Sequence, residues 1–328
     1  MPRDVLIAIG GGLMSAVAAV AFFGGSAFSL LFVYFASVPL LMVGLGLGPK
    51  AVTIAAGAGI CATGIVGGLI PAGIFGLIQA LPAWIVSRLA MLRFSTAESE
   101  IENAENRDDG KSTNWYSPGL ALSVLALLAS MIIVGAAVTA GEGGMKGMVE
   151  AYLAKAFDFM TSTMGDQGKD RMVTTLALFF PGVIGASWVT MIAVNAVVAQ
   201  GVLARMGRNL RPTPAYSGID LPLWYSWTIV VAAAVALIGN ILGAEELGYA
   251  AYNVAIVAAV PYFFLGLAVI HTLARRVASP GLVLVGVYGV IIVSMWAAVV
   301  VAGVGIAEQW VGLRDRQNDD EDGHLPTK

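Results

Sequence analysis

Amide side chains inside long apolar segments are the groups of this sequence best suited to binding a ligand. An amide without a partner in hydrocarbon costs several kcal/mol, so each must meet either another helix or a bound molecule. An indole that faces a cavity adds a flat apolar wall for a ring-containing ligand. On this basis the predicted ligand-binding residues are Gln79, Trp188, Asn195, Asn240 and Asn253. Hydrogen bonding between helices is the alternative for each amide.

Groups suited to catalysis are scarce in this sequence. The centres of the apolar segments carry no ionisable side chain, which argues against a proton relay or a voltage sensor. The chain has only 2 histidines, which are too few to suggest a histidine metal site or a nucleophile–histidine pair. No phosphate-cradling glycine loop and no zinc-protease helix motif occurs. We therefore expect no enzyme activity, no catalytic residues, no cofactor and no metal ion.

The apolar segments themselves predict the fold class. Hydrophobic residues make up 58% of the chain and charged residues 12%, whereas a soluble domain is about a quarter charged. Many segments approach the roughly 20 residues that a helix needs to cross about 30 Å of hydrocarbon. They cover residues 5–23, 28–46, 51–70, 72–91, 119–140, 173–203, 223–242, 249–273 and 282–304. We predict an all-α fold, a polytopic transmembrane helix bundle of about eight or nine spans in contact with the lipid bilayer.

Two polar interruptions divide the chain. We predict an N-terminal four-helix transmembrane packet over 1–92, an acidic cytoplasmic linker over 93–117, a C-terminal transmembrane packet over 118–304 and a charged tail over 305–328. The linker is rich in Glu, Asp, Asn and Ser and cannot bury enough apolar area to fold alone. The acidic run in the tail predicts disorder.

The second interruption has helical periodicity. Apolar residues from Met145 to Met164 follow the spacing of one helical face, and four charged residues lie largely opposite: Lys146, Glu150, Lys155 and Asp158. We predict an external amphipathic helix over 142–166. In one interpretation it lies in the lipid interface, and in the other it is a lid over an outward-facing cavity.

Small residues recur in the first helix at the spacing of one helical turn. Ala8, Gly12 and Ala16 follow each other every four residues. Helices in lipid associate by close approach, so this smooth face predicts a helix-packing surface. The face is interpreted either as packing within the chain or as a docking face for another membrane protein.

Basic residues predict the orientation, because loops that carry Lys and Arg stay in the cytoplasm. A cytoplasmic N-terminus places the following residues inside: Arg3, Lys50, Arg88, Arg93, Arg205, Arg208, Arg211, Arg275 and Arg276. The tail then ends outside despite Arg314 and Arg316, unless the segment 282–304, which has glycines near its start, is broken or re-entrant. The net charge of -3 gives no basic surface for nucleic acid, which we do not expect as a partner.

Several stretches of the second half carry a family resemblance. Residues 180–183, 187–195, 221–224, 253–271 and 305–310 resemble the YybS-like family of uncharacterised bacterial multi-spanning membrane proteins, with the densest match over 261–271. That family is distantly similar to the substrate-binding components of energy-coupling-factor vitamin transporters, which present a small-residue stripe of the first helix to a partner subunit. The resemblance implies a multi-pass protein of the bacterial cytoplasmic (inner) membrane. This chain departs from those components by its additional spans and its amphipathic helix.

Two functions fit these features. The first is a transporter-like or small-solute-binding membrane component that takes a small, largely apolar or ring-containing solute between its helices. The alternative is a membrane scaffold or assembly factor without transport activity, which contacts another membrane protein through its smooth helix faces.

Overall fold

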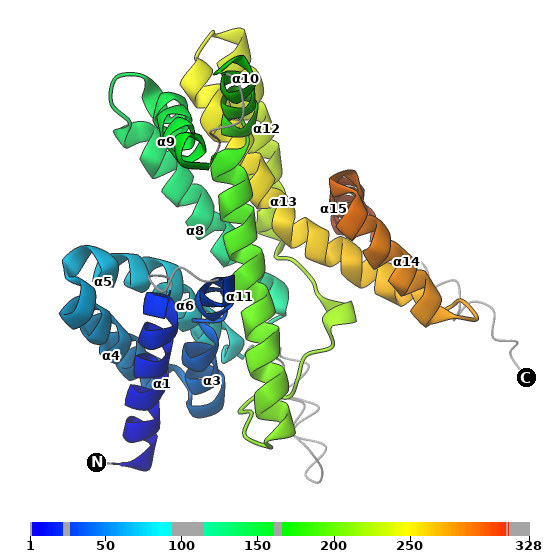
Figure 1. Ribbon diagram of the computed structural model, residues 1–328. Helices are drawn as coiled ribbons and strands as arrows, with labels where there is room; N and C mark the ends of the chain where they lie inside the picture. The colour runs from blue at the N-terminus through cyan, green and yellow to red at the C-terminus, as the bar shows by residue number, and fades with distance from the viewer. Residues whose placement is uncertain (1, 22–26, 94–114, 161–165, 313, 315–328) are drawn as a thin grey trace, which may run out of the picture. The chain divides into compact units, whose positions relative to one another are not determined.

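The computed structural model confirms the helical membrane fold (Figure 1). It describes residues 2–21, 27–93, 115–160, 166–312 and 314, and all regular elements of these residues are helices. Eight of these helices are long and apolar enough to cross a membrane: Arg3–Val20, Ser29–Leu47, Pro49–Gly67, Leu69–Ala90, Pro118–Thr139, Phe180–Arg205, Leu223–Leu242 and Glu245–Ala274. Most of the predicted linker and tail, and residues 161–165 of the predicted amphipathic helix, lie outside the described residues.

The chain divides into two compact units, which we describe separately. Unit 1 comprises residues 1–121 and 191–215, and unit 2 comprises residues 122–190 and 216–328. Helices α8 (Pro118–Thr139) and α11 (Phe180–Arg205) each contribute to both units. The second half of α11 therefore belongs with the N-terminal helices. The predicted division differs here, because it assigned all of residues 118–304 to the C-terminal packet.

The N-terminal helices of unit 1 range from 5 to 19 residues in length, and from residue 38 to residue 90 they follow one another almost directly. They are α1 (Arg3–Val20), α2 (Ala27–Tyr34), α3 (Val38–Leu47), α4 (Pro49–Gly67), α5 (Leu69–Phe75), the π-helix η2 (Gly76–Ala80) and α6 (Leu81–Ala90). Gly48 and Gly68 join consecutive helices at φ angles of 94° and 87°. Glycine adopts this left-handed backbone without a steric cost, so one helix ends where the next begins.

The small-residue face of α1 packs inside unit 1. Ala8, Gly12 and Ala16 are buried, and α1 packs against α4. A Cβ atom built on Gly12 would overlap the carbonyl oxygen of Ala55, so the two helix backbones approach closely at this position. The structure therefore places this face in contact with another helix of the same chain.

Side chains from other helices donate hydrogen bonds to the backbone carbonyls at the break between α2 and α3. Pro39 has no N–H group and disturbs the helical hydrogen bonds around it, and the N–H of Val38 bonds to Phe35 instead of Tyr34. The free carbonyl of Tyr34 accepts a hydrogen bond from Asn195. Ser15 donates to the nearby carbonyl of Ala36. Neighbouring helices thus satisfy backbone groups that water cannot reach.

Unit 2 is organised around its longest helix, α13 (Glu245–Ala274). Besides its parts of α8 and α11, the unit contains α9 (Gly144–Met160), α10 (Asp166–Ala177), α12 (Ser226–Ile241), α14 (Pro280–Val293) and α15 (Met295–Val311), with short 3-10 turns at Tyr216–Gly218 and Leu223–Tyr225. Both α12 and α15 pack against α13. The buried rings of Tyr225 and Tyr262 lie 5.5 Å apart, and the Tyr225 hydroxyl donates to the Ala258 carbonyl over 3.1 Å.

Two boundaries differ from the sequence-based expectation. The predicted span over 173–203 begins only at Phe180, because α10 ends at Ala177 and a turn follows. The predicted span over 282–304 is two helices, with Ser294 between them in extended conformation at φ -125° and ψ 111°. The helices have 14 and 17 residues, about 21 and 25 Å at the helical rise. Each is shorter than the hydrocarbon layer.

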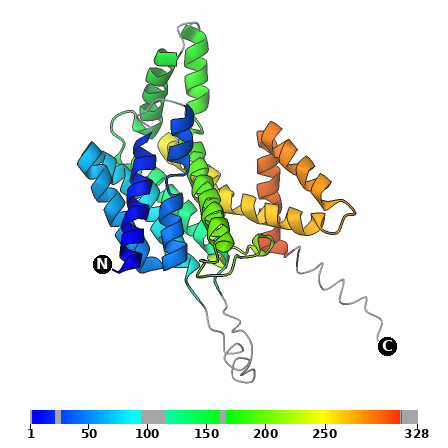
Figure 2. The same cartoon turned by 60° about the horizontal axis from the view of Figure 1, so that its bottom comes forward.

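Helix α15 returns to α13 after α14 has led away from it (Figure 2). Cβ atoms built on Gly266 and Gly305 would overlap the carbonyl oxygens of Val301 and Tyr262. Two glycines, one on each helix, therefore allow backbone contact at this crossing. Of the two alternatives for this segment, the structure shows a broken one, and the break lies at Ser294.

Candidate functional site

Two predicted site residues, Asn195 and Gln79, approach the same broken helix in unit 1. The Asn195 Nδ2 donates to the Tyr34 carbonyl and to the Ser37 hydroxyl, both over 2.7 Å. The Gln79 Nε2, in the π-helix, faces the Val33 carbonyl at 3.4 Å. Both side chains are buried, and among the described residues their amide oxygens have no hydrogen-bond partner. Their donor groups hold the α2–α3 junction together.

Asn253 joins α13 to the start of α11 in unit 2. Its Oδ1 accepts the N–H of Gly182 over 2.7 Å, and its Nδ2 donates to the carbonyls of Tyr249 and Leu178 over 2.9 and 3.2 Å. The first N–H groups of a helix have no partner within it, so this amide satisfies one of them as a cap does. Trp188, further along α11, is half-buried.

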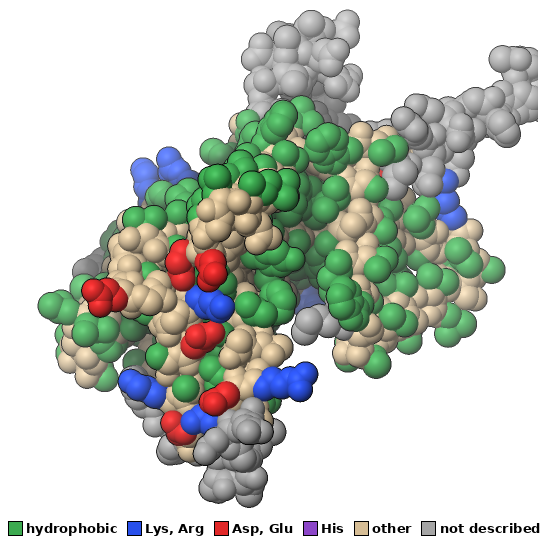
Figure 3. All heavy atoms as spheres, turned by 90° about the horizontal axis from the view of Figure 1, so that it is seen from above, with side chains coloured by type: hydrophobic (Ala, Val, Ile, Leu, Met, Phe, Trp, Pro, Cys, Tyr) green, Lys and Arg blue, Asp and Glu red, His purple; other side chains and the backbone are tan. Residues whose placement is uncertain are grey.

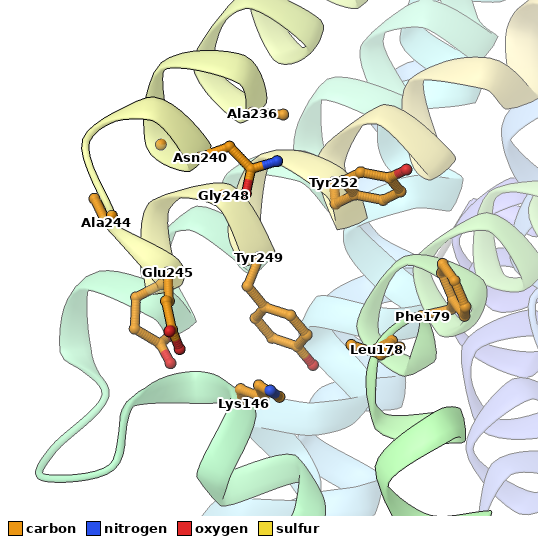
Figure 4. A pocket seen from close by; sticks show the side chains of 13 residues that line it. Lys146, Leu178, Phe179, Ala236, Asn240, Ala244, Glu245, Gly248, Tyr249 and Tyr252 are labelled. Carbon is orange, nitrogen blue, oxygen red and sulfur yellow. The ribbon is translucent and has the colours of Figure 1, made fainter.

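A pocket of about 620 Å³ opens in unit 2 where α12 ends and α13 begins. The start of α9 and the turn before α11 supply its other walls, as Figure 4 shows. The lining residues are Lys146, Leu178, Phe179, Ala236, Gly239, Asn240, Gly243, Ala244, Glu245, Glu246, Gly248, Tyr249 and Tyr252. Of the predicted ligand-binding residues, this pocket contains Asn240 alone.

Small residues shape one wall of this pocket. Gly243 has a φ angle of 65°, which lets the chain reverse at once, and Ala244 donates its N–H to the Gly239 carbonyl over 2.8 Å. A Cβ atom on Gly239 would lie 2.7 Å from the Gly248 nitrogen. The ends of α12 and α13 can therefore converge closely.

Glu246 fastens the amphipathic helix α9 to α13. Its Oε2 accepts the N–H of Met145 over 3.0 Å. Gly144, at a φ angle of 67°, lies so close that a Cβ atom there would overlap the carboxylate. A negative charge at a helix N-terminus is favoured by the helix dipole and by the free N–H groups. This contact fixes the start of α9, and with it Lys146, at the pocket.

The hairpin of α9 and α10 has its own small core. Leu153, Val173 and Ala177 are buried in it, and the Tyr249 hydroxyl of α13 donates to the Ala177 carbonyl over 2.6 Å. Acidic and basic side chains lie interspersed over the end of the molecule where α9 and α10 lie (Figure 3). The predicted amphipathic helix is present as α9. Met145 and Leu153 of its apolar face are buried, whereas Met148 and Tyr152 are exposed.

Comparison with known proteins identifies a family for this chain, but the description of that family names no activity. Residues 13–308 match the family model described as "Predicted membrane protein (DUF2232)". The chain belongs to this family. No curated protein and no solved structure matches the chain. The match begins within α1 and ends within α15, and the family's description as a membrane protein agrees with the apolar helices of the structure.

The charged residues of the pocket were not predicted as site residues. The sequence predicts that Lys146 belongs to the polar face of an amphipathic helix and that Glu245 and Glu246 belong to an exposed turn. Both segments are expected on the outer side of the membrane. Only the fold shows that they face one cavity, because about a hundred residues of other helices separate them in sequence.

Proposed function

We propose that this membrane protein binds a small solute in the pocket between α9, α12 and α13. One observation carries the proposal: parts of α9, α12 and α13 and the turn before α11 border an open pocket of about 620 Å³ and present amide, phenol and charged groups to it. Ligand sites commonly have volumes of roughly 300–1,000 Å³ and combine apolar walls with a few polar groups. The best description is a transporter-like or solute-binding component of the bacterial cytoplasmic membrane.

The proposed orientation follows from the basic residues. With a cytoplasmic N-terminus, the α12–α13 turn and the start of α9 lie outside, so the pocket would receive solute from the outer side. Of the two interpretations of the amphipathic helix, the lid is supported by Lys146, which reaches the pocket from α9. We propose recognition and not catalysis, and the pocket lining includes neither histidine nor a hydroxyl or thiol of Ser, Thr or Cys.

The scaffold function has less support. Its strongest sequence feature was the smooth face of α1, and Ala8, Gly12 and Ala16 are buried within unit 1. The distant similarity to components of energy-coupling-factor transporters stays a prediction. A partner subunit of that kind would have to use another face of the chain.

A binding experiment with a blocked pocket tests the proposal. Asn240 and Val230 lie on the same helix, both side chains are exposed, and only Asn240 lines the pocket. The purified full chain in nanodiscs is heated with vitamins, nucleobases, amino acids and lipid precursors. We expect at least one solute to raise the unfolding temperature of the parent and of Val230→Trp, but not that of Asn240→Trp. A parent protein that no solute stabilises would disprove the proposal.

A further inference from the structure

Some polar groups of the pocket already have protein partners. The Glu246 carboxylate accepts the Met145 N–H, and the Tyr249 hydroxyl donates to Ala177. These two contacts hold the α9–α10 hairpin against α13. Within the described ranges of the chain, the groups that remain to meet a solute are the Lys146 ammonium, the Glu245 carboxylate, the Asn240 amide and the Tyr252 phenol.

Lys146 and Glu245 bring opposite charges to one cavity from separate elements. Figure 4 shows Lys146 on the α9 side and Glu245 on the side of the α12–α13 turn. In the described part of the chain the ion pairs lie elsewhere, and neither Lys146 nor Glu245 takes part in them. Two opposite charges that do not neutralise each other attract a molecule that carries both signs.

Aromatic rings line the same cavity. The rings of Phe179 and Tyr252 have centroids 6.4 Å apart at an angle of 55°, and both residues belong to the lining. Aromatic faces bind apolar and ring-containing groups, and they also attract cations. The apolar body of a solute would therefore rest against these rings while its charged ends reach Lys146 and Glu245.

We propose that the solute is a small zwitterion with an apolar or aromatic body, such as an amino acid or a short apolar peptide. Its ammonium group binds Glu245, and its carboxylate binds Lys146. The Asn240 amide can donate to the carboxylate or accept from the ammonium. This inference rests on the proposed function, because it names the class of solute for the same pocket.

The test compares solutes that differ by one charge. The probes are L-phenylalanine and L-phenylalanyl-L-phenylalanine, which separate the two charges by different lengths, together with the amide and the N-acetyl derivative of each. Binding to the full chain in nanodiscs is measured by calorimetry. We expect at least one zwitterion to bind, and removal of either charge to weaken it by about tenfold or more, since a charged hydrogen bond contributes at least that much.

Two variants assign the charges to residues. Lys146→Gln should bind the zwitterion and its amide equally well, and Glu245→Gln should bind the zwitterion and its N-acetyl derivative equally well. Lys155→Gln and Glu150→Gln are the matched controls on α9, because these residues do not line the pocket, and they should discriminate as the parent does.

The outcomes distinguish a failure of the charge assignment from a failure of the proposed solute binding. If neutral solutes bind as tightly as zwitterions and Asn240→Trp abolishes that binding, the pocket is functional but the charge assignment is wrong. If Lys146→Gln and Glu245→Gln discriminate like the parent, the assignment is wrong as well. If no solute of any charge binds, both the assignment and the proposed function are wrong.

Discussion

Arg314 donates from Nη2 to the Asp220 Oδ1 over 2.7 Å. The same guanidinium bonds the Glu308 carboxylate over 2.5 Å and the carbonyls of Ser217 and Ile219 over 3.0 and 3.1 Å. Burial disfavours the charged form of Arg314, but the hydrogen bonds and charges of Glu308 and Asp220 outweigh it, and its pKa lies above the ordinary value. The end of α15 is thereby fixed to the segment that precedes α12.

This contact predicts the topology of the last helices. Because α12 and α13 would cross the membrane in succession, the segment before α12 and the turn after α13 lie on the same side. Arg314 must also be there, so α14 and α15 would enter and leave the membrane on one side as a re-entrant pair. In the proposed orientation, the C-terminal tail is cytoplasmic together with the basic loops.

Labelling of single cysteines from one side of the membrane checks this topology. Cys61 is the only cysteine and is first replaced by serine. In sealed vesicles, an impermeant maleimide should label Asn318→Cys and Ser279→Cys from one side, and Glu142→Cys from the other. Labelling of Asn318→Cys together with Glu142→Cys would show that the last segment crosses the membrane.

Loss of Arg314 should destabilise unit 2. The Glu308 side chain is only 5% exposed, so Arg314→Ala leaves a buried carboxylate without its cation, at a cost of about 3 kcal/mol. Asp220 is the control, because its side chain is 73% exposed and Asp220→Asn should cost less than about 1 kcal/mol. Unfolding is followed with purified protein. Equal effects of the two variants would contradict a buried pair.

The close approach of α1 and α4 predicts different effects at two nearby glycines. Gly12→Ala should destabilise unit 1 by about 2 kcal/mol, since the new methyl group meets the Ala55 backbone. A Cβ atom added to Gly10 would meet open space. Gly10→Ala should therefore be neutral or slightly stabilising, because alanine has a higher helix propensity than glycine. If Gly12→Ala unfolds like the parent but loses a membrane partner in crosslinking, the docking interpretation of this face is correct.

The predicted ligand-binding amides should differ in their contribution to stability. Asn195→Leu removes both donors from the α2–α3 junction and leaves the Tyr34 carbonyl unpaired, which should cost about 2 kcal/mol. Asn240 is exposed, so Asn240→Leu should change stability by less than about 0.5 kcal/mol and act on solute binding instead. Thermal unfolding and solute titration are compared for both variants. A stable Asn195→Leu that no longer binds solute would assign Asn195 to the ligand.

The fold class was predictable because run length and apolarity are local properties of the sequence. The sequence shows that Asn195 and Asn253 need hydrogen-bond partners, but most of these partners are distant in sequence. Asn195 bonds to Tyr34 and Ser37 at the α2–α3 break. Asn253 bonds to Leu178 and Gly182 at the start of α11. A broken last segment was one of the predicted alternatives, but the position of the break at Ser294 could not be predicted. No proline or glycine marks it, and the contacts that accompany it, at Gly305 and Arg314, form only after α15 packs on α13.

The pocket was predictable only in part. Asn240 was identified as an amide in an apolar segment, whereas Lys146 and Glu245 belong to polar stretches that sequence alone assigns to solvent. Their meeting depends on the turn at Gly243 and on the Glu246 contact with α9.

The Glu246 carboxylate has a further consequence for motion. It belongs to the pocket lining and also holds the first turn of α9, so a molecule that draws this carboxylate toward itself competes directly with the Met145 N–H. Occupancy of the cavity and the anchoring of the outer hairpin would then be linked through one side chain, and measurements of hairpin mobility would report on what the cavity contains.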